Sequence, residues 1–207
     1  MVDVVTDTRL RIIEAARTRL LADGYAGLST RKVAEEAGVP LSQLHYHFGS
    51  KGGLITALFA EENNRLLERQ TEMYAQDKPL WQRYEQACDF LEDDLESGYV
   101  RVLQEMLAAG WSNPEIGDVV RDLLARWFVL LAEVAREAER RFGALGPFTP
   151  EEIATLVANA FIGSEALLLL GFERPVMPIR SALRRIGVII REREEAAGAV
   201  GAPIVAG

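Results

Sequence analysis

Apolar residues recur at helical spacing along most of this sequence, and glycine or proline residues interrupt the pattern at intervals. In the first such segment Leu10, Ile13, Ala16 and Leu20 form a stripe with a period close to that of an α-helix. No segment shows the strict apolar–polar alternation that is typical of a half-buried strand. The sequence therefore predicts an all-α chain of about nine helices. The predicted helices cover residues 8–22, 31–37, 41–48, 51–74, 79–96, 99–109, 115–142, 149–170 and 179–195.

Several helix boundaries have a chemical signature. Thr149 is followed three residues later by Glu152, which is the spacing of a capping box and predicts a helix start. Gly24 follows Asp23 and predicts a stop, because glycine tolerates the left-handed conformation that often ends a helix. Ser29 is an expected N-cap. Pro40 suits a first helical turn, where its missing N–H would have no partner in the helix.

Composition excludes several classes of protein. Cys88 is the only cysteine, so an internal disulfide and a cysteine-based zinc site are excluded. His45 and His47 are the only histidines, so a centre of three histidines is excluded, and we expect no metal and no cofactor. There is no uninterrupted run of eighteen apolar residues and no signal-peptide pattern. We therefore expect no contact with a membrane and a cytoplasmic location.

The charge of the 207-residue chain is distributed unevenly. The net charge is -8, yet residues 1–53 carry seven basic and six acidic residues. The remaining residues, 54–207, carry sixteen basic and twenty-five acidic residues. This asymmetry predicts two functional parts, of which only the first could approach a polyanion.

Residues 28–51 read LSTRKVAEEAGVPLSQLHYHFGSK and contain two short predicted helices joined through a glycine. This is the pattern of a helix-turn-helix, whose second helix lies in the DNA major groove. The segment resembles the TetR (tetracycline-repressor) family of transcriptional regulators, and the resemblance covers roughly residues 9–56. The motifs that carry it are DGY at residues 23–25, L-S/T at Leu28-Ser29, Val33-Ala34, Ala37-Gly38-Val39, Tyr46-His47-Phe48, and Ser50-Lys51 with Leu54.

Two positions depart from the family pattern. The family usually has Tyr where this chain has His45, and Ser or Thr where it has Pro40. Both departures bear on which operator sequence is bound. The rest of the chain matches the family only in length, helix count and position. The resemblance implies a DNA-binding domain over residues 1–53 and a helical effector-binding and dimerisation domain over 54–195. Residues 196–207 lack helical periodicity, so we expect them to form a disordered tail.

The second predicted helix supplies most of the candidate DNA contacts. Leu41 and Leu44 would anchor it, and Gln43 could form two hydrogen bonds with adenine. The resemblance implies that Ser29 caps the preceding helix and that Gln43 and His45 lie in the groove. Arg9 and Arg11 could reach flanking phosphates or a minor groove. The expected DNA-binding residues are Thr30, Arg31, Ser42, Gln43, His45, Tyr46, His47 and Lys51.

Large apolar side chains in the second part could form a plain core or line a cavity between helices. A cavity of this kind would suit a hydrophobic or aromatic small molecule. Glu165, if it lined the cavity, would favour a cationic or hydrogen-bond-donating ligand. The candidate lining residues are Trp81, Tyr84, Cys88, Tyr99, Leu103, Met106, Trp127, Leu131, Phe161 and Glu165.

The last two predicted helices have apolar stripes that are wider than the core of one chain can cover. Two such helices from each of two subunits would form a four-helix bundle, and the family resemblance implies the same homodimer. The residues expected at this interface are Leu156, Ala160, Leu167, Ile179, Leu183, Ile186 and Ile190.

These features predict a ligand-responsive homodimeric transcriptional regulator. Its simplest form is a repressor that a small molecule releases from an inverted-repeat operator on double-stranded DNA. One alternative is a helical protein–protein adaptor with a vestigial helix-turn-helix. The other alternative is an enzyme. The sequence has no phosphate-binding glycine loop, no metal-ligand spacing and no nucleophile constellation, so we expect no enzymatic activity. The operator, the effector and the choice between repressor and activator stay open.

Overall fold

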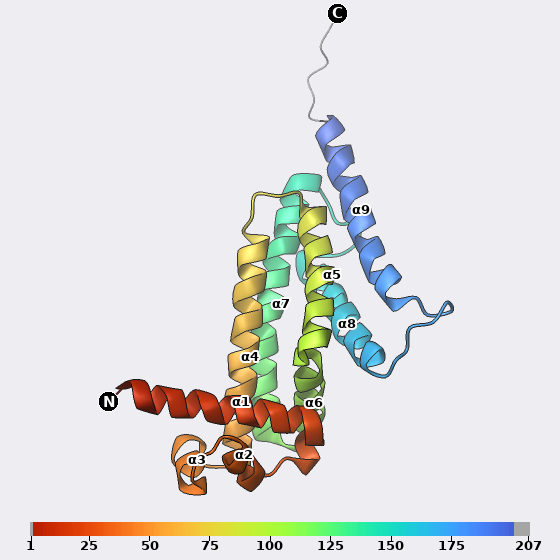
Figure 1. Cartoon of the computed structure of the whole chain (residues 1–207). Coiled ribbons are helices and arrows are strands. Elements are labelled where there is room, and N and C mark those ends of the chain that lie inside the picture. Colours follow the sequence, from red (N-terminus) through yellow and green to blue (C-terminus); the bar gives the residue numbers. More distant parts are fainter. Residues whose placement is uncertain (1, 201–207) are drawn as a thin grey trace, which may run out of the picture. The chain divides into compact units, whose positions relative to one another are not determined.

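Nine α-helices and no strand make up residues 2–200, the part of the chain that this computed structural model describes (Figure 1). Side chains are described for residues 7–198. The predicted all-α fold class is confirmed. The helices are α1 (Val2–Gly27), α2 (Thr30–Glu36), α3 (Leu41–Phe48), α4 (Lys51–Tyr74), α5 (Leu80–Ser97), α6 (Tyr99–Ser112), α7 (Pro114–Phe142), α8 (Pro150–Leu169) and α9 (Ile179–Val200).

Most predicted boundaries lie within two residues of these helices. Helix α1 begins at Val2, before the expected residue 8, and α6 ends at Ser112, past the expected residue 109. Two further boundaries also differ. The predicted stop at Gly24 is a kink, because Gly24 has φ 68° and ψ 172° while the chain resumes helical geometry up to Gly27. Helix α9 continues through an alanine-containing stretch to Val200, past the expected end at residue 195. The remainder of the predicted tail, residues 201–207, lies outside the described residues. The capping box is confirmed, since Thr149 Oγ1 accepts from the Glu152 amide at 3.2 Å and Thr149 N–H donates to Glu152 at 2.8 Å.

The chain divides into two compact units. The first contains Met1–Leu66 and Ser97–Leu124, and the second contains Leu67–Glu96 and Ala125–Gly207. Helices α4 and α7 each begin in the first unit and end in the second. The unit that holds the helix-turn-helix therefore extends beyond residues 1–53. A functional boundary near residue 53 stays a prediction.

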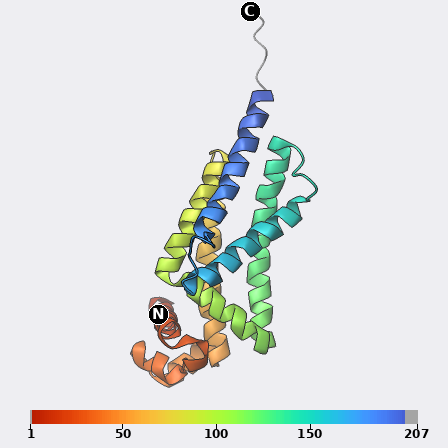
Figure 2. The same ribbon diagram turned by 90° about the vertical axis from the view of Figure 1, so that its right-hand side faces the viewer.

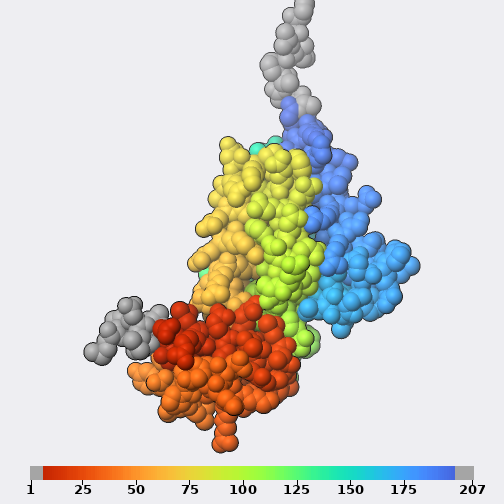
Figure 3. All heavy atoms as spheres, viewed as in Figure 1, coloured from red at the N-terminus to blue at the C-terminus, as the bar shows by residue number. Residues whose placement is uncertain are grey.

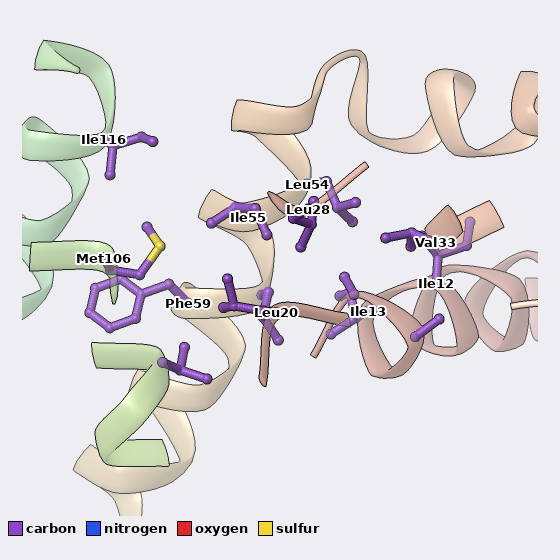
Figure 4. Packing of buried hydrophobic residues seen from close by; sticks show 14 of the residues in the cluster. Ile12, Ile13, Leu20, Leu28, Val33, Leu54, Ile55, Phe59, Met106 and Ile116 are labelled. Atoms are coloured by element: carbon purple, nitrogen blue, oxygen red, sulfur yellow. The ribbon is translucent and has the colours of Figure 1, made fainter. Parts of the chain in front are cut away.

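One continuous apolar core holds the first unit together (Figure 4). It includes Phe59 and Ile55 of α4, Ile12 and Ile13 of α1, and Met106 of α6, and each of these side chains is at most 1% exposed. The start of α7 contributes to the same core. Full burial of one such side chain contributes about 1.5–3 kcal/mol. The helix-turn-helix thus depends on α6 and on the start of α7 for its core. The red and orange atoms of residues 7–48 form one continuous body (Figure 3).

Buried polar contacts connect the helices of the second unit. The Arg83 guanidinium is 3% exposed, donates to Glu137 at 2.6 and 3.1 Å, and donates to the Tyr74 carbonyl at 2.6 Å. Glu194 of α9 accepts from the backbone amide of Leu80 at 3.3 Å. That amide has no partner within α5, because it lies in the first helical turn. These bonds join the end of α4, the start of α5, α7 and α9.

Helices α8 and α9 contact each other (Figure 2), and much of α8 is uncovered. By length and composition alone α8 could cross a membrane, since its most apolar 18-residue window has a mean hydropathy of 1.4 and 22% of that window is buried. The sequence predicts no such helix when an uninterrupted apolar run is required, because Glu165 interrupts the apolar part of α8. Helix α8 therefore leaves apolar surface uncovered within one chain.

Candidate DNA-binding interface and ligand cavity

Helix α3 presents a polar and aromatic face to solvent. Ser42, Gln43, His45 and Tyr46 are exposed, and the side chain of Tyr46 is 82% exposed. Leu44 on the opposite face is completely buried in the core of the first unit. Core packing therefore accounts for Leu44 and leaves the other four side chains available to a partner.

An arginine from α1 fixes the turn before α3. The Arg11 guanidinium donates to the Ala37 carbonyl at 2.6 Å, where the last carbonyls of α2 have no partner within the helix. The Arg9 guanidinium lies 5.8 Å from the centre of the Phe48 ring, which is within the range of a cation–π contact. Both arginines thus have partners inside the first unit. The sequence suggested outward contacts with phosphates for them.

The connection between α3 and α4 is tightly packed. His45 Nδ1 lies 3.0 Å from the Gly49 carbonyl, which requires the proton on Nδ1 and leaves Nε2 as the ring's other hydrogen-bonding atom. Ser50 Oγ accepts from the Gly53 amide at 3.0 Å and caps the first turn of α4. A Cβ atom on Gly53 would lie 2.2 Å from the Phe48 carbonyl oxygen, so only glycine fits there without a shift of the backbone.

Lys51 has a structural partner that the sequence did not predict. Its Nζ donates to the Tyr25 carbonyl at 2.6 Å and lies 4.5 Å from the centre of the Tyr25 ring. Burial lowers the pKa of Lys51 from its usual value. The ammonium group therefore joins the start of α4 to the segment after the α1 kink. A direct contact of Lys51 with phosphate stays a prediction.

The first turn of α2 offers a different kind of contact. Arg31 is exposed and has no ion pair or hydrogen bond among the described side chains, whereas its neighbour Lys32 lies 3.4 Å from Asp23. Thr30 and His47 are half-buried beside this exposed face. Ser29 occupies the N-cap position, but its side chain forms no capping hydrogen bond, so the cap expected from the family is not made.

Glu105 of α6 forms a contact with α1 that the sequence did not predict. Its carboxylate accepts from the Tyr25 amide at 2.9 Å, beside the α1 kink, and also pairs with Arg101 at 3.0 Å. The two residues Tyr25 and Glu105 lie 80 positions apart, so no local motif could have connected them. Helix α6 is therefore held to the helix-turn-helix by a charge-assisted hydrogen bond in addition to the shared core.

The second unit contains a cavity of about 260 Å³. The end of α4, α5, α7, α8, α9 and the segment after α7 all line it. Four lining residues, Gly143, Ala144, Ile189 and Arg193, are also exposed, which places the opening between that segment and α9. The aliphatic side chains of the wall come from Leu80, Leu131, Val134, Ala135, Ala138, Leu145, Ile153, Ala154, Val157, Ile186, Ile189 and Ile190.

The cavity contains only part of the predicted pocket. Tyr84 and Leu131 line it, whereas Tyr99, Leu103 and Met106 belong to the core of the first unit and must be removed from the pocket. The remaining five candidates, Trp81, Cys88, Trp127, Phe161 and Glu165, lie in the second unit outside the cavity wall.

Three of these five side chains form specific contacts with other residues of the second unit. Trp127 donates from its indole N–H to Gln70 at 2.7 Å, and Phe161 packs against Tyr84 with ring centres 6.1 Å apart. Trp81 lies under the Arg191 guanidinium at 5.0 Å. The pocket predicted from the sequence consists mainly of aromatic residues. It lacks aliphatic wall residues such as Val157, because the spacing of such residues is the same in a cavity wall and in a core.

The apolar residues that α8 and α9 expose are only partly those predicted. Leu156 is 52% exposed, as an interface residue would be in an isolated chain. Ile179 and Leu183 are buried within the chain, and Ile186 and Ile190 are half-buried in the cavity wall, so these four offer little free surface. Ile189 also borders the cavity, but it is 59% exposed. Ala160 and Leu167 are half-buried. Among the described side chains of α9, the exposed large apolar ones are Val188 and Ile189, at 48% and 59%.

Residues 12–58 match the model of the family described as bacterial regulatory proteins, tetR family. The HTH-type transcriptional regulator UidR of Escherichia coli K12 is 24% identical to this chain over 149 residues, which are 68% of this chain and 70% of that protein. The matched residues include α2, α3 and the start of α4. The resemblance predicted from the sequence is therefore confirmed, and the similar proteins are regulators, as expected of a chain that is not an enzyme.

Solved structures with the same fold cover most of both chains. A transcriptional regulator of Saccharomonospora viridis in complex with choline has a TM-score of 0.73 at 21% identity and covers 90% of this chain and 96% of its own. The regulator FadR of Bacillus subtilis in complex with stearoyl-CoA has a TM-score of 0.70 at 16% identity and covers 86% of this chain and 97% of its own. At these identities the likeness is one of fold.

Proposed function

We propose that this chain, a TetR-family transcriptional regulator, acts as a homodimer that binds an inverted-repeat operator and leaves it when a small molecule enters the second unit. In this proposal the protein is a repressor that works in the cytoplasm, where its DNA is. The observation that carries it is the exposed face of α3, which combines base-reading side chains with a buried anchor.

DNA recognition would proceed through α3 in the major groove. Gln43 and Ser42 are the exposed side chains suited to base edges, and His45 would offer Nε2. Tyr46 and Arg31 would contact phosphates, since both are exposed and neither is needed for the core. His47 and Thr30 are half-buried and would contribute at the edge of this surface.

Dimerisation would cover the uncovered apolar faces of α8 and α9. Leu156, Val188 and Ile189 are exposed apolar residues on these two helices, and only 22% of the most apolar window of α8 is buried. A self-complementary four-helix bundle buries such faces on both subunits at once. This interface differs from the predicted one by the loss of Ile179, Leu183, Ile186 and Ile190 and the gain of Val188 and Ile189.

The ligand would bind in the cavity of the second unit and act through continuous helices. Helix α7 lines the cavity and continues back into the first unit, and α4 ends beside the cavity at Tyr74. A ligand that prefers one arrangement of these helices shifts the population of that arrangement. The complexes of two related folds with choline and with stearoyl-CoA support a small-molecule site, although those ligands differ from each other.

Selection of bound DNA from a random duplex library tests this function. Purified protein at moderate salt should enrich an inverted repeat with half-site centres about one helical turn, roughly 34 Å, apart. Sedimentation of the free protein should give twice the mass of one chain. A folded protein that enriches no sequence would argue against operator binding, and a stable complex with another protein instead would favour the adaptor.

A further inference from the structure

The cavity wall carries one formal charge. Arg193 is the only acidic or basic residue among the residues that line the cavity. The hydroxyl-bearing residues in the wall, Tyr74 and Tyr84, are neutral, because burial raises the pKa of both phenols above the usual value. A ligand inside this cavity therefore meets apolar surface on nearly every side and a single positive charge at the opening.

The charge of Arg193 is not compensated by the protein. Among the described residues it has no ion pair and no hydrogen bond. Three other arginines of α9 are paired: Arg180 lies 2.8 Å from Glu92, Arg184 lies 2.7 Å from Asp89, and Arg191 lies 2.8 Å from Glu195. Arg185 has no ion pair with a described residue either, but it lies outside the cavity wall. Arg193 thus combines two properties, a place in the cavity wall and an unused guanidinium.

One of the two hydroxyl groups in the wall is already engaged. The Tyr84 hydroxyl already donates to the Leu183 carbonyl at 3.0 Å. A buried polar group of a ligand that found no partner would cost about 1–3 kcal/mol, so the body of a ligand must be apolar. Arginine binds a carboxylate through two parallel N–H donors, which makes a carboxylate the matching head group.

The volume of the cavity limits the size of the apolar body. An apolar cavity of about 150 Å³ accommodates benzene, which has six carbon atoms. In proportion, the volume of about 260 Å³ suits a body of about ten carbon atoms.

We propose that the cavity binds a hydrophobic monocarboxylate of about ten carbon atoms, with the apolar body enclosed by α7, α8 and α9 and the carboxylate on Arg193. This proposal rests on the proposed function in one respect, because it takes the cavity to be the effector site. It corrects the preference for a cation that a wall containing Glu165 would have had, since Glu165 does not line the cavity.

Three probes that share a ten-carbon alkyl group and differ in their head group test the proposal: decanoate, 1-decanol and decyltrimethylammonium. Calorimetric titration of the full chain, without DNA, should show decanoate binding about tenfold or more tighter than decanol, and the cation binding weakest. Arg193→Gln should lower the affinity for decanoate about tenfold and leave that for decanol unchanged.

Two variants serve as controls. Arg185→Gln removes an exposed arginine from the same helix outside the cavity wall, and it should leave all three affinities unchanged. Ala138→Phe fills the cavity and should abolish binding of decanoate and decanol, while thermal unfolding confirms that the variant folds.

Several outcomes would overturn the proposal. Equal affinity for decanol and decanoate, or preference for the cation, would contradict the anionic head group. Equal losses in Arg193→Gln and Arg185→Gln would place the carboxylate elsewhere, and a folded protein that binds none of the probes would reject the ligand class. Selection of operator DNA is measured without these probes, so each of these failures would leave the proposed DNA-binding function standing.

Discussion

The two units of this molecule differ in how their apolar residues are used. The first unit packs residues from α1, α2, α3, α4, α6 and α7 into one core in which Phe59, Leu44 and Leu54 are 0% exposed. The second unit encloses a cavity of about 260 Å³ and leaves Leu156, Val188 and Ile189 in solvent. This difference fits the proposed function: a surface that holds α3 in one orientation needs a closely packed core, whereas a unit proposed to bind a ligand and a second subunit needs incomplete packing.

Truncation of core side chains should give the largest contrast between the units. Phe59→Ala removes a completely buried ring from the first unit and should lower the free energy of unfolding by about 3–5 kcal/mol. Ile190→Ala removes a half-buried side chain that already borders a cavity and should cost about 1–2 kcal/mol. Urea unfolding of both variants measures the difference, and equal losses would contradict the comparison.

Two adjacent glycines test how closely α4 packs on the end of α3. Gly53→Ala places a Cβ 2.2 Å from the Phe48 carbonyl oxygen and should cost about 2–3 kcal/mol. Gly52→Ala is the matched control, because its Cβ would meet nothing nearer than Ser50 Oγ at 3.6 Å. That control should be neutral or gain up to about 1 kcal/mol from helix propensity. Similar thermal unfolding of both variants would show that the close contact is unimportant.

An ion pair in each unit should respond to pH with opposite sign. The hydrogen bond from Arg83 chiefly lowers the pKa of Glu137, so the stabilisation from Glu137 is present above the usual carboxyl pKa of 4.5 and is lost as the pH falls. Glu137→Gln should therefore cost about 1–2 kcal/mol at pH 7, and the difference from the wild type should shrink towards pH 4. Chemical unfolding at both pH values provides the measurement.

Glu62 in the first unit is the counterpart of Glu137, and its pKa is shifted in the opposite direction. Burial raises the pKa of Glu62, although Arg17 lies 3.3 Å away, so the ionised carboxylate opposes folding above that pKa and the penalty disappears as the pH falls. Glu62→Gln should leave stability at pH 7 unchanged or slightly higher, within about 0.5 kcal/mol. A loss as large as that of Glu137→Gln would mean that the ion pair with Arg17 outweighs burial.

Filling the cavity should give a small change in stability, of opposite sign to the core truncations. Ala138→Leu adds apolar volume to the wall of the cavity and should raise the midpoint of thermal unfolding by an amount equivalent to about 0.5–1 kcal/mol. An equivalent enlargement in the first unit, Ala34→Leu, should be destabilising because Ala34 is 3% exposed in a solid core. Destabilisation by both would indicate that the cavity has no room for added atoms.

The sequence predicted the helices and the first unit's exposed face far better than the second unit's cavity. Helical periodicity and capping are local, so the bounds of α3 and the capping box at Thr149 could be read directly. Ser42, Gln43 and Tyr46 were predicted outward because Leu44 fixes the inner face of a short helix. The contact of Glu105 with Tyr25 could not be foreseen, since it depends on how distant segments pack.

The same limit explains the errors in the second unit. Tyr99, Leu103 and Met106 have the spacing of a cavity wall and of a core alike, and only the tertiary packing assigns them to the first unit. Ile179 and Leu183 likewise have the spacing of an interface, but they are buried within the chain. Apolar periodicity indicates which side of a helix is covered, and it does not indicate what covers it.

The central claim is that the exposed face of α3 reads DNA sequence, and one measurement tests it most directly. The affinity of the full chain for the selected duplex and for a scrambled duplex should be compared at one salt concentration, for the wild type and for the double variant Ser42→Ala with Gln43→Ala. Gln82→Ala, an exposed change on α5, serves as the control. Loss of a base contact costs about 1–3 kcal/mol, so the ratio of the two affinities should fall by about tenfold or more. Unchanged discrimination by the double variant, with the protein folded, would contradict the claim.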